Sequence, residues 1–133
     1  MEILYDKPFC KISYRCEAQV PFILADWSGF STSVQFRESC ETVLSTLSEK
    51  RISRVVMDGG KAKVVAAEDQ VWLNTDWVAR ATDAGYRTCA IVIPKDLFGQ
   101  MSTRQVVTQA DQSKVTIRMF DDTIDAMNWI VTT

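Results

Sequence analysis

The chain has 133 residues, of which 47% are hydrophobic, and a length of this order buries a core without disulfide or metal support, so we expect a single domain over residues 1–133. Its formal net charge is -2 with both signs interspersed, which argues against nucleic acid and anionic membrane surfaces as partners. It contains no histidine, which excludes Ser-His and Cys-His catalytic pairs and histidine metal ligands.

The opening residues, MEILYDKPF, lack the basic start and long apolar run of a signal peptide, and no later segment reaches membrane-spanning length. We therefore expect a cytoplasmic protein without a membrane span. A short apolar stretch occupies residues 3–5, and Pro8 interrupts it.

An antiparallel hairpin is predicted from residues 10–17 and 20–27. The first segment alternates with the period of a half-exposed strand. Its inward set is Cys10, Ile12, Tyr14 and Cys16, and its outward set is Lys11, Ser13, Arg15 and Glu17. The second segment carries apolar residues at both parities, which is typical of a strand that is buried on both faces.

The first helix is predicted after Ser31, where Thr32 and Gln35 have the spacing of a capping box. One apolar stripe runs along it and predicts its buried face. The stripe consists of Phe36, Cys40, Val43, Leu44 and Leu47. We expect this helix to end near Glu49 or Lys50.

The next strand, residues 52–58, contains the apolar run Val55-Val56-Met57 that is typical of a parallel sheet covered on both faces. Gly59-Gly60 predicts a turn after it, followed by a connector at residues 61–65. Ligands of open α/β sheets bind at the carboxyl ends of strands, so Asp58 marks the expected position of a site.

A long helix is predicted from Ala66 or Ala67, with Glu68 and Asp69 near the positive end of its dipole. Its predicted buried face consists of Leu73, Trp77, Ala81 and Ala84, and Gly85 follows its end. Trp72 falls nearly opposite this face, so we expect a loop to cover it or part of it to be exposed.

The remaining pattern predicts a buried strand at Cys89–Ile93 that Pro94 ends, and a helix capped by Asp96. Gly99 and a second cap-like pair at residues 102–103 are typical of a helix break, so both one continuous helix and two pieces remain open here. A strand at residues 114–120 and a final helix follow. Asp121 or Asp122 caps that helix, which turns Ala126, Trp129 and Ile130 inward.

These elements predict an α/β fold with a single mixed β-sheet, in which an N-terminal antiparallel hairpin is followed by β-α units and the helices pack on the sheet. The four cysteines have no CxxC spacing and lie within apolar patterns, so we interpret them as core residues.

Several local sequences point to a known family. They are Trp27-Ser28-Gly29, the strand ending in Asp58, the helix start Glu68 to Leu73, Phe120-Asp121-Asp122, Ala126 and Trp129-Ile130. With these segments, nearly the whole chain resembles the bacterial SpoIIAA-like family, which contains small stand-alone relatives of STAS domains and of the CRAL-TRIO lipid-binding fold. The resemblance implies a β-α fold and, for most stand-alone members, no established activity.

Anti-sigma-factor antagonists of the STAS class carry a Ser or Thr at the start of the helix after this strand, and its phosphorylation switches partner binding. The matching region here, residues 64–69, reads VVAAED and has no hydroxyl. A phosphate at a helix start changes the local charge, and Ala66 and Ala67 have no group that accepts one. The sequence therefore predicts a module without a phosphorylation switch.

Candidate binding residues surround the expected site. They are Asp58, Lys61, Lys63, Glu68, Asp69 and Trp72. Asp58-Gly59-Gly60-Lys61 lacks the spacing of a phosphate-binding loop, and turn and dipole roles account for the acidic residues. We assign no catalytic residue, metal ligand or cofactor, since capping also explains Asp121, Asp122 and Asp125.

Three functions remain open. The first is a non-enzymatic module that acts through protein contacts of the surface from Asp58 to Trp77, with self-association as one form. The second is a carrier of a small apolar or anionic ligand, in a cleft lined by Trp27, Phe30 and Trp77 under a flap with Lys61 and Lys63. The third is an enzyme built on Asp58 and Glu68.

Overall fold

The computed structural model describes residues 1–133. Its strands are β1 (Glu2–Lys7), β2 (Cys10–Glu17), β3 (Val20–Gly29), β4 (Arg54–Ala62), β5 (Thr88–Val92) and β6 (Thr116–Phe120). Its helices are α1 (Ser33–Lys50), α2 (Ala67–Trp72), η1 (Leu73–Trp77), α3 (Val78–Asp83), α4 (Leu97–Gln109) and α5 (Thr123–Ile130). No helix has both the length and the apolar character that crossing a membrane requires.

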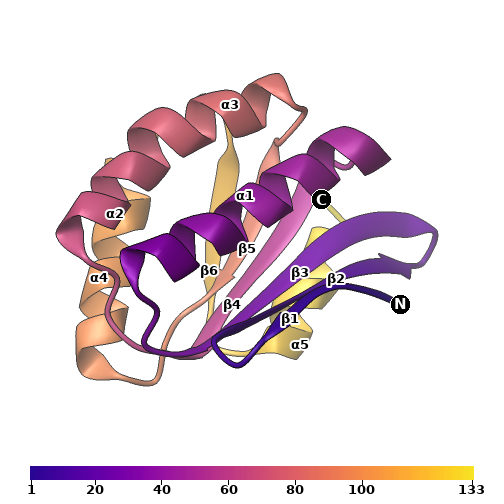
Figure 1. The fold of residues 1–133 in the computed structure, drawn as a ribbon. Coiled ribbons are helices and arrows are strands. Elements are labelled where there is room, and N and C mark those ends of the chain that lie inside the picture. Colours follow the sequence, from indigo (N-terminus) through magenta and orange to yellow (C-terminus); the bar gives the residue numbers. More distant parts are fainter.

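The strands form one six-stranded sheet in the order β1-β2-β3-β4-β5-β6 (Figure 1). The pairs β1–β2 and β2–β3 are antiparallel, whereas β3, β4, β5 and β6 run parallel. The predicted mixed sheet with its N-terminal hairpin is confirmed, since β2 and β3 are that hairpin. Strand β1 has no counterpart among the predicted strands, because it is a mostly exposed edge strand with little apolar signal.

Helices cover both faces of the sheet, and α5 lies on the face opposite to α1 (Figure 1). Under α1, η1 and α3, the larger core joins helix residues such as Val43 and Trp77 to Ile23 and Val55 of the sheet. Under α5, a smaller core joins Ala126 and Ile130 to the other face of β3, β4 and β5. Because every β-α-β connection of the parallel part returns on the α1 side, the starts of α1, α2 and α4 gather at the carboxyl ends of β3, β4 and β5.

Helix α1 begins and ends as its sequence predicts. Thr32 Oγ1 accepts from the Gln35 backbone N–H at 3.2 Å, and the Gln35 side chain accepts from the Thr32 backbone N–H at 3.0 Å. These two bonds satisfy backbone donors that the first turn of a helix otherwise leaves free. Arg51 ends the helix with a φ of 53°, in the left-handed conformation.

The prediction of a turn at Gly59-Gly60 was wrong, because β4 continues to Ala62. Its continuation pairs with the end of β3, and the Gly60 carbonyl accepts from the Lys95 backbone N–H at 3.3 Å. A Cβ at residue 59 would lie 3.0 Å from the Val92 carbonyl oxygen. The glycine therefore permits a close approach to the end of β5. Asp58 is the last β4 residue that pairs with β5, not the end of the strand.

The predicted long helix is present as α2, η1 and α3 in direct succession, with a π-helical segment in the middle. Gly85 follows it with a φ of 114°, which L-residues rarely adopt. Of the two alternatives for the helix after Pro94, the continuous one is present, since α4 runs unbroken after its Asp96 cap. Asp122 caps α5 by accepting from the Asp125 backbone N–H at 3.0 Å.

Two predictions for β2 were wrong. Ser13 was expected to face water, but it is buried, and Arg15 Nε donates to its hydroxyl at 3.3 Å. The long arginine side chain thus covers the small polar one. Cys16 was expected in the core but is exposed beside the turn that joins β2 to β3. The remaining cysteines, Cys10, Cys40 and Cys89, are buried as predicted.

Candidate functional site

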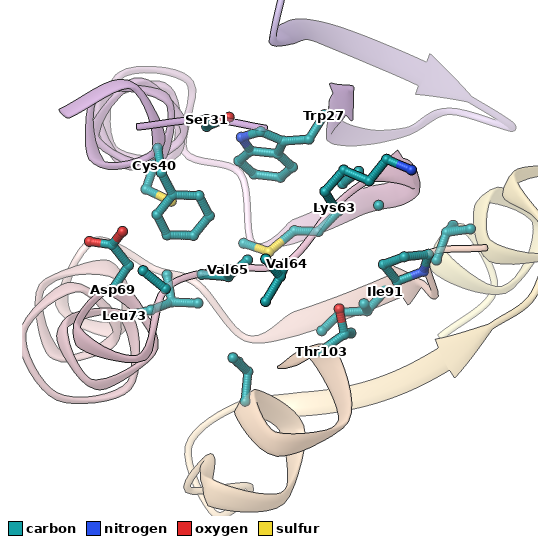
Figure 2. A pocket seen from close by; sticks show the side chains of 18 of the residues that line it. Trp27, Ser31, Cys40, Lys63, Val64, Val65, Asp69, Leu73, Ile91 and Thr103 are labelled. Carbon is teal, nitrogen blue, oxygen red and sulfur yellow. The ribbon is translucent and has the colours of Figure 1, made fainter. Parts of the chain in front are cut away.

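An apolar pocket of about 100 Å³ lies at the carboxyl ends of β3, β4 and β5 (Figure 2). Of the 19 residues that line it, 12 are hydrophobic. Trp27 and Phe36 form one side, with ring centroids 5.9 Å apart. Met57 and Ile91 contribute from adjacent strands, and Leu73 contributes from η1. A concave apolar surface of this kind is the usual setting for a small ligand.

The segment from Lys63 to Ala66 closes one side of the pocket and is tied to its surroundings by backbone hydrogen bonds. The Lys63 N–H donates to the Gly29 carbonyl at 3.0 Å, and the Val65 N–H donates to Ser102 Oγ at 3.2 Å. The Gln70 side chain donates to the Val65 carbonyl at 2.9 Å. The connector therefore forms a wall of the pocket between β3 and α4.

Asp69 contributes a buried carboxylate to the pocket wall. One of its oxygens accepts from Ser33 Oγ at 2.8 Å, and the other accepts from Arg37 Nε at 2.9 Å. The Arg37 guanidinium also lies 5.0 Å from the ring centroid of Trp72. The carboxylate thus joins the start of α1 to the start of α2, and Trp72 is partly exposed beneath the arginine.

Two cationic side chains lie at the pocket, and each has an anionic partner. Lys63 Nζ lies 3.7 Å from an Asp96 oxygen, and Arg37 Nε lies 2.9 Å from an Asp69 oxygen. Lys61, which does not line the pocket, pairs with Asp26 at 3.2 Å. The charges at the pocket are therefore compensated by ion pairs.

Asp58 lies on the other face of the sheet, beside α5. Its carboxylate accepts from Thr123 Oγ1 at 2.5 Å and from the Gly60 backbone N–H at 3.0 Å. It borders a shallow polar depression together with Lys61 and Lys95. Glu68 is exposed at the start of α2, so the structure does not bring it to Asp58 as a carboxylate pair.

The candidate residues therefore fall into separate places. Lys63 and Asp69 line the apolar pocket, and Trp72 lies next to it beneath Arg37. Asp58 and Lys61 border the polar depression, and Glu68 borders neither. Of the aromatic residues predicted for the cleft, only Trp27 lines it. Phe30 is exposed outside the pocket, and Trp77 is buried in the core.

Several pocket residues had no functional signal in the sequence. Phe36 and Cys40 have the spacing of a core stripe, and they do pack against the core while their outer atoms reach the pocket. Burial raises the pKa of the Cys40 thiol well above its usual value, so it is protonated and a poor nucleophile at neutral pH. Thr103 and Val106 of α4 could only be placed here by the tertiary fold.

Comparison of the whole structure with solved structures gives the fold that local sequence suggested. An uncharacterized protein of the DUF3478 family from Shewanella loihica PV-4, described as having a SpoIIAA-like fold, superposes with a TM-score of 0.64. The match covers 95% of this chain and 97% of that chain, at 14% sequence identity. The chain has a SpoIIAA-like fold.

The match to this SpoIIAA-like structure confirms the predicted α/β architecture over nearly the whole chain. No protein-family model matches the sequence, and no curated protein matches it. The similar structure is itself uncharacterized, so the function must be inferred from this chain's own geometry.

Proposed function

We propose that the protein is a non-enzymatic binding module that holds a small neutral apolar ligand at the carboxyl ends of β3, β4 and β5. The apolar pocket carries this proposal, since hydrophobic residues form most of its lining. An engineered apolar cavity of about 150 Å³ binds benzene. The pocket here, at about 100 Å³, is of the same order and accordingly suits a group no larger than a small ring.

The start of α2 supports a module without a phosphorylation switch. Ala66 is the residue that precedes the helix, and no side chain caps it. The hydroxyls that contact this segment come from other helices, where Ser33 of α1 donates to Asp69 and Ser102 of α4 accepts from the Val65 N–H. Occupancy of the pocket would thus depend on ligand concentration and not on modification of this helix.

Cyclopentane is a suitable probe of the pocket, because it is a small neutral hydrocarbon ring. We expect titration to shift the methyl NMR signals of Ile91 and Val106, which line the pocket. The signals of Val56, which lies in the core under α5, should not move. Absence of any shift at a saturated cyclopentane concentration would contradict the proposed function.

A matched pair of variants in α4 tests whether cyclopentane binds in the pocket. Thr103 lines the pocket, whereas Thr108 of the same helix is exposed and does not. Thr103→Phe should fill the pocket and remove the cyclopentane shifts, whereas Thr108→Phe should leave them. Equal responses in the two variants would place the binding elsewhere.

Exposed apolar side chains around the pocket support a second function for this end of the sheet, which is contact with another protein molecule. Those on the segments around the pocket are Phe30, Val34, Val64, Val71, Leu97, Phe98 and Met101. Their segments are close, because Lys63 bonds to Gly29 and its carbonyl lies 3.3 Å from a Cβ built at Gly99. A ligand that fits the pocket leaves most of this surface uncovered, and large exposed apolar surfaces mark interaction sites.

Self-association is the form of protein contact that the chain alone can test. Sedimentation velocity over a range of concentrations should show a dimer that Phe98→Asp disrupts. Ile124→Asp is the control, because Ile124 on α5 is 65% exposed and Phe98 is 67% exposed. A monomer at every concentration, or equal effects of the two variants, would reject self-association through this surface.

A further inference from the structure

The two buried tryptophans differ in whether the indole N–H, the only polar group of the side chain, makes a hydrogen bond. Trp77 is 1% exposed, and its indole N–H donates to the Cys40 carbonyl at 2.8 Å. Trp27 is 8% exposed, and its indole nitrogen has no hydrogen-bond partner in the protein. Buried tryptophan N–H groups usually find a partner. The exception is the tryptophan that lines the pocket.

The unpartnered indole is unusual within this protein. The other buried polar atoms without a partner are Asp26 Oδ1 and Arg54 Nε. Each belongs to a group that bonds through another atom, since Asp26 pairs with Lys61 and Arg54 donates to the Thr133 carbonyl. The indole has no second polar atom. A buried donor left unbonded costs about 1 to 3 kcal/mol, so its place in the pocket needs a reason.

The position of the indole supplies that reason. Figure 2 shows the Trp27 ring along one wall of the pocket, with its nitrogen on the edge toward Ser31. Ser31 also lines the pocket and makes no hydrogen bond through its side chain within the protein. This edge is a polar margin on an otherwise mainly apolar surface.

Building on the proposed function, we propose that the ligand carries one neutral hydrogen-bond acceptor, a carbonyl, hydroxyl or ether oxygen, which accepts from the Trp27 indole N–H. A carboxylate is disfavoured, because the cations at the pocket, Arg37 and Lys63, are already paired with Asp69 and Asp96 and leave no free positive charge to bind it. The indole nitrogen is covered in the ligand-free structure. The half-exposed Ser31 side chain turns aside as the ligand enters, a scale of movement that is common on binding.

Cyclopentanone and cyclopentane test this inference, because they have the same ring and differ by one carbonyl oxygen. We expect cyclopentanone to bind about three- to tenfold more tightly, the net effect of one hydrogen bond. In ¹⁵N-labelled protein, cyclopentanone should move the Trp27 indole N–H signal downfield, and cyclopentane should not. Trp27→Phe identifies that signal by its loss, and Trp129→Phe on α5 identifies a control signal.

The outcomes separate the two proposals. Equal affinities with an unmoved indole signal would overturn the acceptor and leave the apolar pocket in place. Failure of both compounds to bind would overturn the pocket itself. Trp27→Phe keeps an aromatic ring but removes the donor, so it should make the two affinities equal. If this variant does not fold, the wild-type affinities and indole signal decide the question alone.

Discussion

Replacing Arg37 with leucine is expected to lower the free energy of unfolding by about 2 to 3 kcal/mol. The Asp69 carboxylate has only 3% of its side chain exposed, so it would keep a buried charge with Ser33 as its remaining side-chain donor. Removing one partner of a fully buried pair costs about 3 to 5 kcal/mol. Arg37 is 39% exposed, so we take a smaller value, and leucine still gives Trp72 an apolar cover.

Urea denaturation of two further variants shows whether the loss of stability in Arg37→Leu comes from the unpaired buried charge of Asp69 or from the loss of any arginine ion pair. Arg80→Leu breaks ion pairs to Glu41 and Asp76 at 2.6 and 2.9 Å, all of whose side chains are well exposed, so it should cost less than about 1 kcal/mol. Adding Asp69→Asn to Arg37→Leu removes the stranded charge and should recover more than half of the loss. Equal effects of Arg37→Leu and Arg80→Leu would contradict a buried-charge origin.

The elements of the fold could be predicted because their signals are local. A capping box, a continuous apolar run and a glycine after a helix each lie within a few residues, and α1, β5 and the end of α3 follow them. Strand β1 carries no comparable signal, because a short edge strand buries little. Gly59-Gly60 carries the signal of a turn, but its actual role depends on the distance to β5.

The candidate site was predictable only in part, because its partners come from distant segments. The acidic start of α2 was correctly placed, and Glu68 is a solvated first-turn residue as dipole arguments predict. Asp69 differs because Arg37 and Ser33 reach it from α1, which no pattern within α2 shows. Asp58 was placed near the correct end of the sheet, but the side-chain alternation of β4 turns it toward α5.

Gly99→Ala is a direct test, because helix propensity and tertiary packing predict opposite changes in the free energy of unfolding. Helix propensity alone predicts that alanine stabilises α4 by up to about 1 kcal/mol. A Cβ at this position would lie 2.9 Å from Pro94 Cβ and 3.3 Å from the Lys63 carbonyl oxygen. Overpacking of this kind costs about 1 to 3 kcal/mol, so we expect a net loss of about 1 kcal/mol in urea denaturation. A more stable Gly99→Ala protein would show that this contact does not limit the packing.

A double-mutant cycle with Pro94→Gly identifies the contact responsible. The glycine removes both Pro94 carbons that a Cβ at residue 99 would meet, at 2.9 and 3.1 Å, so Gly99→Ala should cost less in that background. Because Lys63 lines the pocket, the remaining crowding should also move the backbone NMR signals of Lys63 and Val64. The absence of a side chain at Gly99 therefore lets Pro94 and the pocket wall lie close against α4, which explains why a residue typical of a helix break stands in its first turn.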